Sequence, residues 1–352
     1  MNTEWAAFLE SAGAIRVDGQ TQHFGNPNQE LQAALTHTIC CDLSHHGLIA
    51  AQGIDACAFL QGQLTCDVRH ITPDLSLIGA YCTPKGRMLA SCRLFRCADS
   101  YYLSLPLEMV NPTLTRLRKY VLRARVTLDD ASDTLTTIGI AGNQATSLLK
   151  KILGAVPEQT NGVISTSQNI TVICLPGSAP RYILYGEVYQ IKVIWEALTS
   201  GTVPTGPEAW RLLDILSGTP AIYPGTTELF IPQMTNLQLL GGISFQKGCY
   251  TGQEIVARTH YLGKLKRRMY LARVDTPTPP RPGDLVYSPR ADANQNAGHL
   301  VDACHHPDGG YQVLAVALIE CAENGVLQLG DAVHSALRLE PLPYHFEDKA
   351  TA

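Results

Sequence analysis

The stretch FQKGCYTGQEIVAR, residues 245–258, carries most of the chemical information in this chain of 352 residues. Thr251 and Glu254 have the spacing of a capping box, in which two side chains bond the backbone at the start of a helix. The spacing therefore predicts a helix that starts at Gly252 and continues through Arg258.

A helix at this place puts Cys249 just before its N-terminus, with Lys247 two residues earlier. The helix dipole and a nearby ammonium both favour the thiolate, so Cys249 is the best candidate for a reactive residue among the eleven cysteines. Gly248 and Gly252 on either side allow a tight, exposed backbone. The same backbone donors and Lys247 could hold a carboxylate instead. From the residues alone, a reactive cysteine, an anion-binding turn and an ordinary helix cap all remain open.

The string KGCYTGQE, residues 247–254, resembles the signature of the YgfZ family. That family comprises folate-binding proteins related to the T-protein (aminomethyltransferase) of glycine cleavage, and it is linked to tRNA modification and to iron–sulphur cluster assembly or repair. The resemblance covers about Gly47 to Tyr344, and its other segments are LQGQLTCDV (60–68), TPKGRMLASCRLF (83–95), TLTRLRKYV (113–121), EAWRLLDILSGTPAI (208–222), FIPQMTNLQLLGGISF (230–245) and LRLEPLPY (337–344).

The resemblance implies an α+β fold, with a T-protein-like, folate-binding body of two intertwined subdomains and a C-terminal β-barrel. We expect residues 1–265 to form the aminomethyltransferase-like region, with an inner α+β subdomain at about 129–207, and residues 266–347 to form the barrel. The short alternating segments after a Pro-rich turn in the last region are typical of a small barrel. A helix after Asn111 is expected to carry Pro112 in its first turn.

The resemblance also implies site residues. Cys249 would be the functional cysteine, Lys247 the motif lysine and Trp210 a folate-binding tryptophan, while a second such tryptophan falls at His46, where an imidazole can still stack. His45 and His46 are expected to diverge as neighbours in a strand. The predicted cofactor-binding set is Trp210, His46, Tyr250, Gln253, Glu254 and Arg258, and no metal site is predicted.

The position of the T-protein's catalytic aspartate falls at Ala90 or Ser91 in this sequence. Without that carboxylate, proton transfer at the folate nitrogen loses its general acid or base. The resemblance therefore predicts a binding protein on an enzyme fold. A folate-dependent aminomethyl or one-carbon transferase is the alternative.

The net charge of −4 hides two basic segments. Residues 111–128 hold five basic side chains and residues 255–274 hold six, with no acid in either segment. Such segments can be solvated faces, rims for the anionic tail of folate, or surfaces for an RNA backbone, and the sequence leaves these open.

Several function classes lack their motifs. No cysteine pair has C-x-x-C spacing and no glycine pair has G-x-G spacing, which disfavours a zinc ribbon, a thioredoxin motif and a dinucleotide fingerprint. The sequence contains no run of about 18 apolar residues, so it predicts no membrane span. The N-terminus lacks a basic leader, and we therefore expect a cytoplasmic protein.

We therefore expect a tetrahydrofolate-binding protein that assists iron–sulphur enzymes, including those that modify tRNA. Its partners would be folate, iron–sulphur proteins or their assembly machinery and, in one hypothesis, tRNA itself, with no membrane. One thiolate cannot hold a cluster alone, so any cluster role of Cys249 would be shared or transient. This expectation requires the thiol to be exposed at a turn that faces a pterin-sized cavity.

Overall fold

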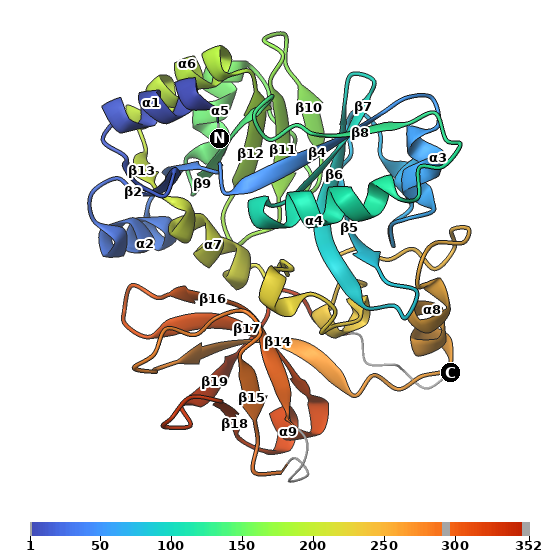
Figure 1. Cartoon of the computed structure of the whole chain (residues 1–352). Coiled ribbons are helices and arrows are strands. Elements are labelled where there is room, and N and C mark those ends of the chain that lie inside the picture. The colour runs from blue at the N-terminus through green and yellow to red at the C-terminus, as the bar shows by residue number, and fades with distance from the viewer. Residues whose placement is uncertain (1, 291–295, 347–352) are drawn as a thin grey trace.

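The computed structural model describes residues 2–290 and 296–346, and its elements form three bodies (Figure 1). Two sheets lie in the upper part of Figure 1, and a closed barrel lies below them. The expected domain ranges 1–265 and 266–347 include residues outside this description, namely residue 1, residues 291–295 and residue 347. The arrangement is the expected α+β fold with a C-terminal barrel.

The first body is an antiparallel five-stranded sheet of order β5-β6-β7-β4-β8. Its strands are β4 (His46–Gln52), β5 (Leu77–Cys82), β6 (Met88–Cys97), β7 (Ser100–Pro106) and β8 (Thr127–Asp130), and it is accompanied by α3 (Ala56–Gln61), the short η1 (Val68–His70) and α4 (Leu107–Arg118). Phe59 and Leu60 of α3 and Leu114 and Leu117 of α4 are buried in its core, so the two helices are held by their apolar faces.

The second body is a six-stranded sheet of order β10-β11-β12-β9-β3-β13. Its strands are β3 (Ile39–Asp42), β9 (Thr136–Ala141), β10 (Val163–Ser165), β11 (Thr171–Leu175), β12 (Arg181–Gly186) and β13 (Val203–Thr205). Strand β3 precedes the five-stranded sheet in the chain but pairs with β9 of the second sheet, and β13 pairs with β3 in parallel. The two bodies are intertwined because the chain enters the second sheet, leaves it and returns.

The two faces of the second sheet are covered differently. Helices α1 (Thr3–Ser11), α5 (Ala145–Leu153) and α6 (Val188–Thr199) cover one face, where Trp5, Leu149 and Trp195 are buried together. The other face packs against the first sheet and against α7 (Pro207–Leu216), where Phe95 and Trp210 share one buried cluster. The space between the two sheets is therefore mostly filled, and what remains open lies at its edge.

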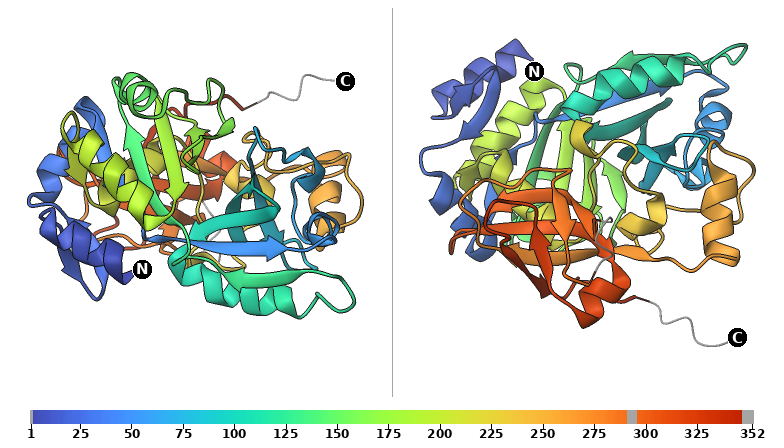
Figure 2. Two further views of the ribbon diagram at one scale, coloured as in Figure 1. Left: turned by 90° about the horizontal axis from the view of Figure 1, so that it is seen from above. Right: turned by 60° about the horizontal axis from the view of Figure 1, so that its bottom comes forward.

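The third body is a closed barrel of order β14-β17-β16-β15-β18-β19. Its elements are β14 (Arg267–Val274), β15 (Leu285–Tyr287), β16 (Gly298–His305), β17 (Tyr311–Leu318), α9 (Ile319–Asn324), β18 (Leu327–Leu329) and β19 (Ala336–Glu340). Alternating apolar side chains fill its interior, as the short alternating segments predict. The right-hand view of Figure 2 brings the barrel, in orange and red, to the front.

Connecting elements join these bodies. They are β1 (Ile15–Val17), β2 (Gln20–His23), α2 (Pro27–Thr36), η2 (Pro224–Thr226), η3 (Pro232–Thr235) and α8 (Gln253–Tyr261). Helix α8 lies on the opposite side of the molecule from α1 in the views of Figures 1 and 2. No helix in the part of the chain that is described is long and apolar enough to cross a membrane.

The expected position of Pro112 in a first helical turn is wrong. Helix α4 begins at Leu107, so Pro112 lies inside it. The helix starts earlier because Met109 and Val110 extend the buried face that Leu114 continues. This apolar packing outweighs the backbone hydrogen bond that a proline cannot donate.

Candidate functional site

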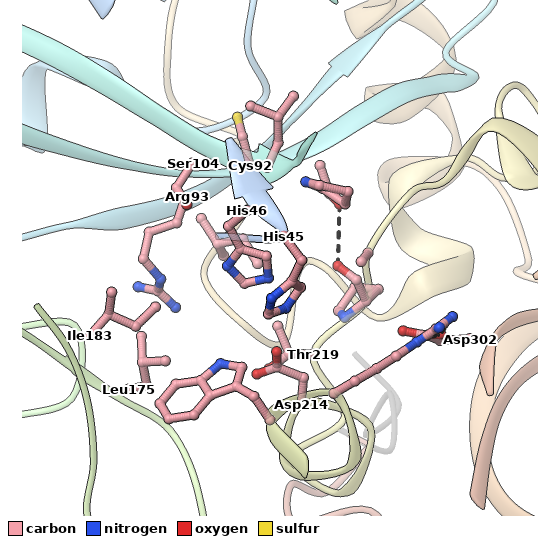
Figure 3. A pocket seen from close by; sticks show the side chains of 18 of the residues that line it. His45, His46, Cys92, Arg93, Ser104, Leu175, Ile183, Asp214, Thr219 and Asp302 are labelled. Carbon is pink, nitrogen blue, oxygen red and sulfur yellow. Dashed lines mark hydrogen bonds and ion pairs between the residues drawn. The ribbon is translucent and has the colours of Figure 1, made fainter. Parts of the chain in front are cut away.

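A cavity lies where the three bodies meet (Figure 3). The space free of atoms at this place amounts to about 780 Å³, a figure that includes the open solvent at its mouth. Its walls come from β6 and β7 of the first sheet, β11 and β12 of the second, helix α7, the segment 219–223, and Asp302 of the barrel. Such a junction is a common place for a ligand site.

Trp210 of α7 lines this cavity and is fully buried. The Arg181 guanidinium lies 4.7 Å from the centre of its ring, so a cation covers one ring face. Gly139 of β9 makes room for the indole, because a Cβ there would lie 2.3 Å from a ring carbon. The indole Nε1 has no hydrogen-bond partner among the described residues. Stacking of a pterin on Trp210 stays a prediction.

His46 lines the same cavity, together with His45. Their ring centres lie 4.3 Å apart, so the expectation that the two side chains diverge is wrong. Strand β4 begins at His46, and His45 belongs to the preceding turn, where strand alternation does not apply. Burial lowers the pKa of both imidazoles, which keeps them neutral at pH 7. Within the described chain, Nδ1 of His45 has no partner.

Two arginine–aspartate pairs stand in the cavity wall. Arg181 donates from Nη2 to Oδ1 of Asp214 at 2.6 Å. Arg211 donates from Nε to Oδ1 of Asp302 at 2.7 Å, and the Tyr223 hydroxyl donates to the other oxygen of that carboxylate at 3.1 Å. Burial raises the pKa of Tyr223, so its hydroxyl keeps its proton. The second pair joins α7 to the barrel across the cavity.

The position of the missing aspartate also lies at the cavity. Ser91 is a lining residue, whereas Ala90 is buried beside it on β6. The Ser91 hydroxyl donates to the carbonyl of Pro220 at 3.2 Å and accepts from the amide of Ile222 at 3.1 Å. This hydroxyl is therefore engaged in holding the segment 219–223, and β6 brings no carboxylate to the cavity.

Lys247 is buried and makes three hydrogen bonds. Its Nζ donates to the carbonyls of Gln61, Leu64 and Cys66 at 2.7, 2.6 and 2.7 Å. Burial lowers the pKa of this ammonium to about 8. All three of its donors point to backbone oxygens around the end of α3, so the ammonium anchors the motif loop. A catalytic role for it stays a prediction.

Cys249 is exposed, and it is the only exposed cysteine among the described residues. The predicted helix forms, but it begins at Gln253, and Gly252 is its N-cap. The predicted capping box is wrong because Gly252 has a φ of 87°, which places Thr251 outside the helix. A Cβ on Gly252 would lie 2.5 Å from the carbonyl oxygen of Thr83. The motif therefore needs glycine there to dock on the segment 83–87.

The other predicted site residues lie near this loop. Tyr250 is buried, and the Lys247 ammonium lies 5.0 Å from the centre of its ring. Gln253, Glu254 and Arg258 lie on α8, the last two of them exposed. Among the described residues, segment 245–258 contributes nothing to the cavity lining. The structure thus brings Trp210 and His46 together and places the other six residues elsewhere, so the expectation that the thiol faces the cavity is wrong.

Several polar atoms of the cavity wall have no partner within the described chain. Trp210 Nε1, His45 Nδ1 and Arg181 Nε are buried polar atoms with no partner in the described chain. Asp214 has a second carboxylate oxygen that receives no hydrogen bond from the described residues. A flat ring system with donors and acceptors along its edge can satisfy such groups, which otherwise cost free energy. Trp210, His45 and Asp214 would hold it.

Most of the charged residues that line the cavity were not predicted from the sequence. Asp214 lies four residues after Trp210 on α7, so helical spacing could have placed it beside the indole, whereas the same spacing does not place Arg211, the next residue, on that face. Arg93, Arg181 and Asp302 come from three strands in three bodies, and no spacing in the sequence links them.

Comparison with known proteins gives a consistent result. Residues 5–177 match the model of the GCVT N-terminal domain family. The tRNA-modifying protein YgfZ of Colwellia psychrerythraea (strain 34H) is 34% identical over 89% of this chain and 95% of its own length. The protein of the same name from Klebsiella pneumoniae (strain 342) is 32% identical over 92% of this chain and 98% of its own. The glycine cleavage system aminomethyltransferase T of Bartonella henselae has the same fold, with a TM-score of 0.75, 16% identity and 96% of each chain covered.

Proposed function

The chain belongs to the YgfZ family, and on this premise we propose that it is a cytoplasmic tetrahydrofolate-binding protein that supports tRNA modification by assisting the assembly or repair of iron–sulphur enzymes. One observation carries the folate part of the proposal. The cavity between the three bodies collects Trp210, two neutral imidazoles and buried polar atoms that lack partners. This is the lining that a flat, polar heterocycle requires.

Each group has a part in binding. Bound tetrahydrofolate would supply a reduced pterin that carries one-carbon units. The indole of Trp210 and the imidazole of His46 bound the cavity with flat apolar surface. The free oxygen of Asp214 accepts from a ring or exocyclic N–H, and the Arg181 guanidinium holds that carboxylate in place. Burial excludes water from these bonds and so strengthens them.

The exposed thiol of Cys249 supports the iron–sulphur part of the proposal. A thiolate at the surface can reach a metal centre on another protein, and clusters are held mainly by thiolates. Among the described residues there is no group of three or more His, Cys, Asp or Glu side chains placed to hold a metal ion. Any cluster that Cys249 contacts therefore takes its other ligands from a partner.

The alternative of an aminomethyltransferase receives less support from the cavity. At the position of the T-protein's catalytic aspartate, Ser91 is engaged with two backbone groups. Asp214 and Asp302, the two lining carboxylates, each accept a hydrogen bond from an arginine of the cavity wall. Neither is arranged as a general acid.

The two basic segments support a direct contact with tRNA as a second candidate function. Gly86 packs against Ile255 of α8, while Thr83 and Pro84 share a surface hollow with Lys119. The segment 83–87 thus joins α4 to α8. In segments 83–87, 111–128 and 255–274, the exposed cations with no ion pair in the described chain are Lys85, Lys119, Arg123, Arg258, Lys264 and Lys266. Exposed cations without acidic partners favour contact with a phosphate backbone.

Calorimetric titration with tetrahydrofolate tests the proposal. We expect saturable binding by the wild type, weaker binding by His46→Ala and Trp210→Phe, and unchanged binding by Cys249→Ala. Circular dichroism and melting temperature show whether each variant is folded. Wild-type protein that binds no tetrahydrofolate would refute the folate part. Electrophoretic titration with tRNA tests the second candidate, because charge reversal of Lys119 and Lys264 should weaken binding and reduce its salt dependence.

A further inference from the structure

The charges in the cavity wall do not balance. Arg181 is paired with Asp214, and Arg211 with Asp302. Arg93 of β6 is the third lining arginine, and it makes no ion pair with a carboxylate in the described ranges 2–290 and 296–346. With both imidazoles neutral, the cavity carries one uncompensated positive charge.

The contacts of Arg93 hold its guanidinium in place without neutralising it. Nη1 donates to the amide oxygen of Asn161 at 2.7 Å and to the hydroxyl of Ser76 at 3.1 Å. Both acceptors are neutral, and they come from outside β6, so the side chain is fixed across the boundary between the two sheets. A guanidinium keeps its charge even when burial lowers its pKa, as it does here.

The surroundings of Arg93 make this charge costly. Figure 3 shows its side chain reaching into the cavity beside Leu175 and Ile183, which are apolar. The buried guanidinium of Arg181 lies close enough to lower the pKa of Arg93 further. The Nε of Arg181 has no partner in the described chain. Two neighbouring cations beside apolar side chains, sharing the single carboxylate of Asp214, attract an anion strongly.

We propose that Arg93, backed by Arg181, forms an anion-binding subsite in the cavity, and that this subsite takes a carboxylate of the ligand. The inference rests on the proposed folate function for the identity of the ligand, whose glutamate tail carries the carboxylates. The pterin and the tail then bind separate groups: Trp210 and Asp214 hold the ring, and Arg93 holds the charge. The same guanidinium would bind any small carboxylate, whether attached to a pterin or free.

Two fragments of the ligand separate these roles. 6-Methyltetrahydropterin carries the ring without a carboxylate, and p-aminobenzoylglutamate carries the tail without the ring. Calorimetry on Arg93→Gln should show tetrahydrofolate affinity lowered by about tenfold to a hundredfold, the range of one charge-assisted hydrogen-bond pair. Binding of p-aminobenzoylglutamate should be lost, and the affinity for 6-methyltetrahydropterin should stay unchanged. Arg93→Lys should retain part of the tail affinity.

Arg96→Gln is the matched control, because Arg96 lies on the same strand but outside the cavity, near Asp99. Equal losses for both fragments in Arg93→Gln, or no loss for either, would overturn the subsite. Wild-type protein that binds the tail fragment through Arg93 but no pterin would refute the folate function and keep the subsite. Wild-type protein that binds neither fragment would refute both.

Discussion

Replacing Lys247 by methionine should destabilise the protein, because the structure makes this residue an anchor. Methionine keeps most of the buried volume but removes three hydrogen bonds to the carbonyls of Gln61, Leu64 and Cys66. Bonds from a charged donor contribute about 1.5–3 kcal/mol each. Burial of the ammonium, which lowers its pKa to about 8, offsets about 3 kcal/mol of that gain. We therefore expect the free energy of unfolding to fall by about 1.5–6 kcal/mol.

Thermal denaturation and thiol alkylation test this prediction. The first measures stability and the second measures the reactivity of Cys249. The melting temperature should fall by at least about 2 °C, while Lys264→Met, at an exposed lysine, should change it little. Iodoacetamide under native conditions reports on Cys249, the exposed cysteine. A loosened motif loop should leave its alkylation rate at pH 7 unchanged or raise it.

Two results would refute this reasoning. A variant that melts within 1 °C of the wild type, taken as about the precision of the assay, would mean that the three carbonyls find other partners at no cost. A stable variant in which alkylation of Cys249 slows markedly would mean that the Lys247 ammonium acts on the thiol, as the sequence first suggested.

Three further predictions follow from individual contacts. Gly252→Ala should cost about 1–3 kcal/mol of stability, because φ is 87° and a carbonyl oxygen lies 2.5 Å from the new Cβ. Gly248→Ala is the control, since no described atom lies within 4 Å of a Cβ there. Equal melting temperatures for the two variants would contradict this prediction. Burial lowers the pKa of His46 below its usual 6.5, so the unfolded chain takes up that proton first, and stability should fall as the pH drops below about 6.5; His46→Gln should flatten the decline in a denaturation series. Arg211→Met should cost about 3–5 kcal/mol by leaving the Asp302 carboxylate buried and unpaired, and adding Asp302→Leu should recover most of it; a double variant as unstable as the single one would argue against the pair.

Local patterns and the resemblance predicted the architecture well. The barrel follows from short alternating segments, and the helix after the motif forms although the capping box that predicted it does not. The exceptions have specific causes. A capping box was expected at Thr251, but Gly252 takes a left-handed conformation to dock on another loop, and this is a tertiary contact that spacing does not encode.

Single residues of the site could be predicted from their own segments, but the grouping of those residues could not. Trp210 and His46 were identified separately, and the structure brings them to one cavity. Arg93, Arg181 and Asp302 escaped prediction because each belongs to a different body, and their pairing depends on how those bodies dock. The distance in sequence between partners, rather than the weakness of any motif, limited what could be inferred.

The cavity draws its walls from strands that are synthesised far apart in time. Arg93 and Arg181 emerge from the ribosome early, but Asp302 arrives with β16, and the barrel closes only through β19, at Glu340. A nascent or truncated chain that ends before β16 lacks Asp302, and with it the contact between Arg211 and the barrel. The wall of the cavity is therefore complete only in a chain that extends through β16.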